Sequence, residues 1–138
     1  MDRFVKNFIL MSIVYLAMAA VLGVLMIGYP ELLRLKFVHS HLMLLGWVSM
    51  MIYGVGYHIL PRFAGRLLKS TSMGELQFWL ANVGLVGMLL FYTLMQYSTD
   101  TSIYKTLTVV FGVVEAFSIL LFFYNITTTV FGKEPQTP

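Results

Sequence analysis

The chain has 138 residues, of which 59% are hydrophobic and 11% charged, and its mean hydropathy is +0.82. Soluble domains carry about a quarter charged residues, so this composition excludes an ordinary soluble domain and indicates an integral membrane protein. Cysteine is absent, which excludes disulfides and thiolate ligands. The net charge of +3 lies in short clusters between apolar runs, which is typical of membrane topology signals rather than of nucleic-acid binding.

Four apolar segments are long enough to cross a bilayer, which takes about 20 helical residues. They cover residues 8–28, 37–60, 76–97 and 104–131. Tyr29-Pro30 ends the first segment and Pro61 stops the second. Because the connections are short, neighbouring helices should pack antiparallel. The sequence therefore predicts an all-α, integral membrane four-helix up-down bundle, with one domain over residues 1–132 and a polar tail at 133–138.

The basic residues predict the orientation of the bundle. One face would carry six of them: Arg3, Lys6, Arg62, Arg66, Lys69 and Lys133. The other face would carry three: Arg34, Lys36 and Lys105. Since cytoplasmic ends are richer in Lys and Arg, both termini are expected in the cytoplasm. The second helix would then run from the outside to the inside.

Residues 37–66 hold all three histidines of the chain. At about 100° per residue, one stripe of this helix carries a histidine, a glycine and two tyrosines. These residues are His39, Gly46, Tyr53 and Tyr57. His41 would point nearly the opposite way, and His58 would lie on a third face, roughly 28 Å from His39 along the axis. The three histidines therefore cannot share one metal within this helix.

The stripe has two interpretations. Histidine supplies an axial nitrogen to heme iron, and Gly46 would remove the side chain that blocks a porphyrin face. Tyr53 or Tyr57 would then bond a propionate or line the pocket. Alternatively, the glycine is a groove for helix packing, with His39 bonded to a partner at the interface. Periodicity alone leaves both open.

Glu115 is the only carboxylate inside a predicted span, near the middle of the bilayer. An ionised group there costs several kcal/mol, so such residues usually face an interior and find partners. Three interpretations compete: a neutral acid bonded to a neighbouring helix, a proton-relay group, and a metal ligand. Ser118 and Gly112 share its face and could host a bond or a water.

The second segment also resembles a known family. His39, followed by LLGW and by GxGYHxLPR ending at Arg62, is similar to the second helix of subunit I of heme-copper oxidases and related nitric oxide reductases. The resemblance covers residues 37–65 and implies that His39 is an axial ligand of a low-spin heme, with His41 as the alternative. Tyr57, Pro61 and Arg62 look like the family's cytoplasmic ending. The HxHLMLLGW opening also resembles short subunit I-like proteins and, more distantly, heme proteins of the nitric oxide response.

The chain departs from that family after His58, where no further histidine follows. The family's second low-spin ligand, its high-spin heme ligand and its copper ligands therefore have no counterpart, and no oxidase activity is expected of the chain alone. A second axial ligand would come from His41, His58, a methionine or another subunit. A twofold dimer would supply a second His39. A five-coordinate heme with an open position for a gas is equally permitted.

These observations predict a membrane b-type heme protein that binds heme b for electron transfer or for binding NO or O2. The expected partners are a second copy or another membrane subunit, lipid, and a redox partner such as a quinone or a cytochrome, with no nucleic acid. The resemblance implies a multi-pass protein of a prokaryotic inner membrane. The alternatives are a non-heme metal-binding or structural subunit, and a proton-handling subunit that uses Glu115. A second heme at His58, with Arg62 and Arg66 for its propionates, is a further possibility.

Overall fold

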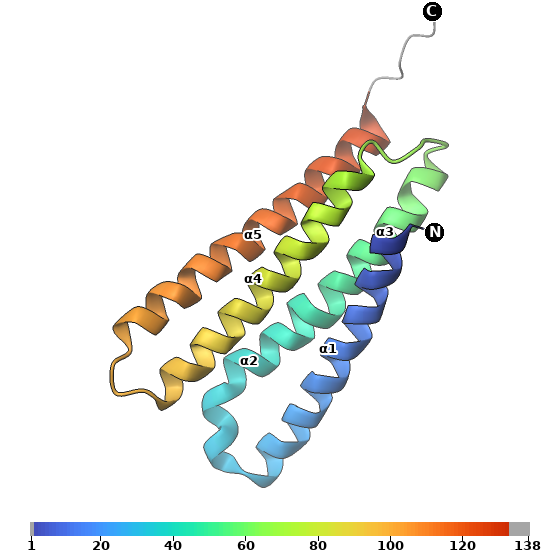
Figure 1. Cartoon of the computed structure of the whole chain (residues 1–138). Coiled ribbons are helices and arrows are strands. Elements are labelled where there is room, and N and C mark those ends of the chain that lie inside the picture. The colour runs from blue at the N-terminus through green and yellow to red at the C-terminus, as the bar shows by residue number, and fades with distance from the viewer. Residues whose placement is uncertain (1, 133–138) are drawn as a thin grey trace, which may run out of the picture.

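The computed structural model describes residues 2–132 and is all-α (Figure 1). Four long helical rods are apolar enough to cross a membrane, which confirms the predicted fold class. They are α1 (Arg3–Gly28), a composite second rod (Pro30–Phe63), α4 (Thr71–Tyr97) and α5 (Ser102–Phe131). The predicted polar tail at 133–138, with Lys133, lies outside the described residues.

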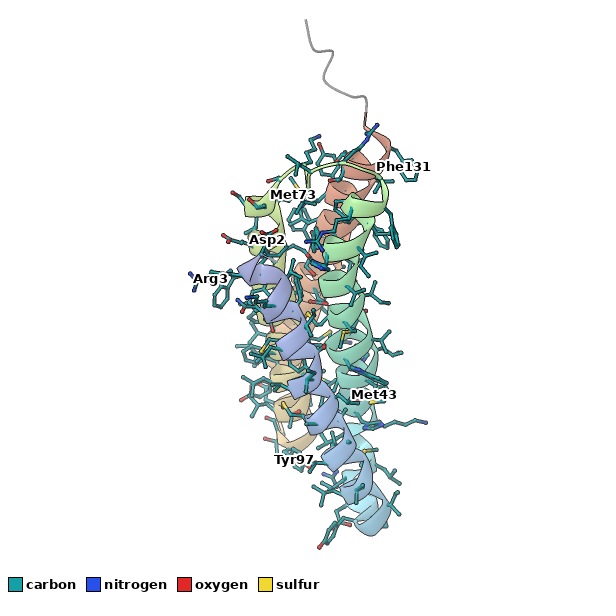
Figure 2. The ribbon with its side chains drawn as sticks, turned by 90° about the vertical axis from the view of Figure 1, so that its right-hand side faces the viewer. Asp2, Arg3, Met43, Met73, Tyr97 and Phe131 are labelled. Atoms are coloured by element: carbon teal, nitrogen blue, oxygen red, sulfur yellow. The ribbon has the colours of Figure 1, made fainter. Side chains whose placement is uncertain are left out.

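Both described ends of the chain lie at the same end of the bundle. Figure 2 places Asp2, Arg3, Met73 and Phe131 toward one end and Tyr97 toward the other. This arrangement is what an even number of antiparallel spans requires. That this end faces the cytoplasm stays a prediction from the Lys and Arg count.

The second rod changes its hydrogen-bond pattern along its length. A 3-10 turn (η1, Pro30–Leu35) leads into α2 (Lys36–His41), a π-helical segment (η2, Leu42–Ser49) and α3 (Met50–Phe63). The π segment begins directly after the two histidines, and π turns are rare and often lie at functional sites. The predicted helix at 37–60 is thus one continuous rod that is not uniformly α-helical.

The predicted helix ends differ from the observed ones for identifiable reasons. α1 and α4 begin before the predicted apolar segments, at Arg3 and Thr71, and Ser70 caps α4 by accepting a hydrogen bond from the Met73 amide at 3.1 Å. Pro61 does not stop α3, which continues to Phe63. The stop is Gly65, whose φ of 65° closes the helix in the left-handed conformation that glycine adopts without strain.

The four rods form two hairpins, α1 with the second rod and α4 with α5 (Figure 1). Aromatic side chains join the hairpins at the end that holds Arg3. The Phe8 ring lies 5.1 Å from that of Phe78 on α4, and the Tyr53 ring lies 4.7 Å from that of Phe122 on α5. Large apolar side chains are exposed on all four rods, as a lipid-facing surface requires.

Candidate functional site

His39 is oriented by a backbone carbonyl of α1. Its Nδ1 lies 3.1 Å from the oxygen of Ala19. Since a carbonyl only accepts hydrogen bonds, Nδ1 is the donor, and Nε2 is the ring nitrogen left to bind a ligand. The ring lies over Gly23, where a Cβ would stand only 2.9 Å from the imidazole Cε1. Two small residues of α1 therefore make room for this imidazole, as the packing interpretation of the stripe expects.

His41 is held in a similar way but by its own helix. Its Nδ1 lies 2.8 Å from the oxygen of Phe37 and donates to it, so Nε2 is again the ring nitrogen left to bind a ligand. The ring packs on Phe37 at a centroid distance of 3.8 Å, and Phe37 stacks on Tyr92 of α4 at 4.2 Å. His41 therefore belongs to an aromatic stack that connects the second rod to α4.

His58 and its arginines are engaged with one another and with α5. Arg62 Nη1 lies 2.6 Å from His58 Nε2 and donates to it. Arg66 donates to the carbonyl oxygens of Thr129 and Gly132. A heme at His58 would have to displace the Arg62 contact, so this end of the rod gives the second-heme hypothesis no support.

The remaining residues of the stripe are buried in helix contacts. Gly46 faces α1, where a Cβ would meet the Tyr15 Cβ at 2.7 Å. Tyr53 and Tyr57 are both 4% exposed and pack edge-on against Phe8 and Phe122 respectively. Gly46, Tyr53 and Tyr57 therefore face the interior of the bundle, and His39 is partly buried. Within one chain, however, Gly46 does not present an open face to a porphyrin, because Tyr15 fills that space.

Glu115 is 2% exposed and lies near the middle of α5. The Ser118 hydroxyl on its face donates to the Glu115 backbone carbonyl at 2.8 Å, not to the carboxylate. Among residues 2–132, neither carboxylate oxygen of Glu115 has a hydrogen-bond partner. The described residues therefore supply no bond from a neighbouring helix to the Glu115 carboxyl group, as one of the three interpretations had expected.

Two buried amides accompany Glu115 and were not predicted as site residues. Gln77 on α4 and Asn125 on α5 are both 0% exposed, and both have amide atoms without a protein partner. The sequence could have indicated Asn125, because its spacing to Glu115 and Ser118 places all three residues on one face of a helix.

The described residues hold no cluster of ligands for a bare metal ion. Between residues 2 and 132, no three His, Asp or Glu side chains lie close enough together to bind one. Comparisons with protein families, with curated proteins and with solved structures found no match for this chain.

Proposed function

We propose that this chain is a membrane b-type heme protein whose iron is held by His39 Nε2. The observation that carries the proposal is the hydrogen bond from His39 Nδ1 to the Ala19 carbonyl. Histidines that ligate metals usually donate their other ring N–H to a carbonyl or a carboxylate, which fixes the ring and leaves Nε2 free. The resemblance of residues 37–65 to the low-spin heme helix of heme-copper oxidase subunit I supports the same residue.

The donor set fits heme better than a bare metal ion. A porphyrin supplies four nitrogens, so the protein needs to add only one or two ligands. A zinc or copper ion held by protein alone needs three or four, and residues 2–132 gather no such set. His41, tethered in the same way to Phe37, is the alternative ligand. The bound group would supply one-electron transfer or the binding of a diatomic gas.

The packing of one chain supports a second subunit at the heme. The space beside the two glycines nearest the site is already occupied within the chain. Tyr15 packs against Gly46, and the His39 ring packs against Gly23. A flat ligand therefore finds no room between α1 and the second rod. A second copy related by a twofold axis would cover the heme and offer its own histidine at the same depth.

The test is an absorption spectrum of protein purified after heme-replete expression. The wild type should show a Soret band and a pyridine hemochrome of b type. His39→Ala should lose the heme, whereas His58→Ala, on the same rod, should retain it because Arg62 already occupies His58 Nε2. A wild type without a Soret band refutes the proposal. If His39→Ala retained the heme and His41→Ala lost it, His41 would be the axial ligand.

A further inference from the structure

Six buried polar side-chain atoms in the described chain lack a protein partner, and they belong to four side chains. These are Tyr57 on α3, Gln77 on α4, and Glu115 and Asn125 on α5. None of the four is more than 4% exposed. Each unpartnered buried atom costs about 1–3 kcal/mol, so native proteins pair such atoms with protein, ligand or water. The gathering of all six in one bundle interior therefore indicates that something polar occupies it.

On α5, the polar buried residues form one line. Glu115, Ser118, Asn125 and Thr129 follow one another at intervals of three, seven and four residues, and all are buried. The line is about 21 Å long at 1.5 Å per residue. Its far end reaches the connection between α3 and α4, because the Lys69 amide donates to Thr129 Oγ1 at 3.1 Å and Asn125 Nδ2 donates to the Ser70 carbonyl at 2.8 Å.

Gln77 and Tyr57 lie between the two ends of this line. Gly84 of α4 packs directly on the Glu115 backbone. Because α4 and α5 are antiparallel (Figure 1), Gln77, seven residues before Gly84, lies about 10 Å from that level toward the Asn125 end. The Tyr57 ring packs at 5.1 Å on Phe122, three residues before Asn125 on α5, and its hydroxyl has no protein partner. The unpartnered atoms are thus distributed along the way from Glu115 to the α3–α4 connection.

The buried residues of α4 on the opposite side of Glu115 are apolar. None of the residues of α5 that precede Glu115 is buried, and the buried residues of α4 beyond Gly84 are Leu85, Gly87, Met88 and Leu89. The other hairpin contributes two phenols near this level, because the Tyr15 hydroxyl reaches Asn82 of α4 and the Tyr53 ring packs on Phe122 of α5. The nearest polar group of α4, Asn82, already accepts a hydrogen bond from the Tyr15 hydroxyl at 2.7 Å. Glu115 is the only buried acidic or basic residue between residues 2 and 132.

We propose that these groups line a water-filled half-channel that carries protons between the α3–α4 end of the bundle and Glu115, a membrane-embedded proton-binding site. A buried water makes about three hydrogen bonds, and the free oxygens and nitrogens of Tyr57, Gln77 and Asn125 provide them. A proton that enters from the solution joins the Glu115 carboxylate to give a neutral acid, and it leaves by the same route. No other reactant takes part, and the heme is not required.

Hydration of the half-channel is tested by thiol labelling, since the chain contains no cysteine. Ser118 is 0% exposed, so a dry interior would protect a cysteine placed there. A small water-soluble methanethiosulfonate reagent reacts with the thiolate, which needs water. In proteoliposomes we expect Ser118→Cys to be labelled and Met88→Cys, buried on the apolar side, to stay unlabelled. Ser98→Cys, in the α4–α5 turn, reports reagent activity. Equal protection of Ser118→Cys and Met88→Cys would overturn the proposal.

Proton access is tested by infrared difference spectroscopy during a pH change. The carbonyl stretch of a protonated carboxylic acid should appear in the wild type and vanish in Glu115→Gln. Gln77→Leu and Asn125→Leu should slow its hydrogen–deuterium exchange by about tenfold, the factor expected for the loss of one hydrogen bond on the path. Thr127→Val is the matched control, because Thr127 is exposed and its hydroxyl bonds only carbonyls of its own helix. Exchange in both amide variants as fast as in this control refutes the half-channel.

Discussion

A contact of α4 with the backbone of α5 predicts an asymmetry between two glycines of this hairpin. A Cβ added at Gly84 would stand 2.7 Å from the Glu115 backbone nitrogen and 2.9 Å from its Cα. Backbone cannot rotate away, so the two helices must separate by several tenths of an ångström. Overpacking of this kind costs about 1–3 kcal/mol. We therefore expect Gly84→Ala to lower the free energy of unfolding of the bundle.

Gly112→Ala is the matched control on the facing helix. Its Cβ would meet only the Met88 sulfur, at an ordinary 3.5 Å. Both substitutions gain the same helix propensity, about 1 kcal/mol for alanine over glycine, so the difference between the variants isolates the packing cost. Equilibrium unfolding in mixed micelles, followed by circular dichroism, should place Gly84→Ala about 1–3 kcal/mol below Gly112→Ala. Equal stability of the two variants would refute the close helix contact.

Three further substitutions probe other contacts by the same unfolding measurement. Ser70→Ala removes the cap of α4 and should cost about 1 kcal/mol; no change would mean that the cap does not form. Tyr15→Phe removes the donor to Asn82 and should cost about 0.6 kcal/mol, with about 1.7 as the upper limit for such bonds in membranes, and a larger loss would point to a lost packing contact. Tyr92→Leu removes the stack on Phe37 and should cost about 0.5–1.5 kcal/mol beyond the change in buried area. A neutral Tyr92→Leu would contradict the contact between α2 and α4.

The four spans were predictable because a bilayer imposes one length and one composition on every crossing helix. The π segment was not, because the switch to i→i+5 bonds depends on tertiary fit rather than on residue type. Here the segment contains Gly46, against which Tyr15 of α1 packs. The stop of α3 at Gly65 rather than at Pro61 shows that a proline in the last helical turn is tolerated.

For the candidate site, the sequence indicated residue depth but not residue neighbours. It predicted His39 on the face that the structure turns inward, yet the Ala19 carbonyl that orients its ring comes from another helix. It identified Glu115 as a carboxylate in mid-membrane, because a charged residue in an apolar run is conspicuous. Gln77 lies nearer to a helix end and did not stand out in the sequence, although the structure buries it completely. Depth follows from counting residues, whereas burial depends on how the helices are rotated.

The two proposals rest on different residues at different levels of the bundle, so each can fail alone. His39 packs on the C-terminal half of α1, whereas the polar line from Glu115 leads to the end that holds Arg3 and Phe131. Loss of heme in His39→Ala should therefore leave the labelling of Ser118→Cys unchanged, and Glu115→Gln should leave the heme content unchanged. Tyr15 contacts both regions, because its ring packs against Gly46 and its hydroxyl donates to Asn82, two residues before the glycine that packs on Glu115. This side chain is therefore one physical route by which a heme at one end and proton uptake from the other would be coupled.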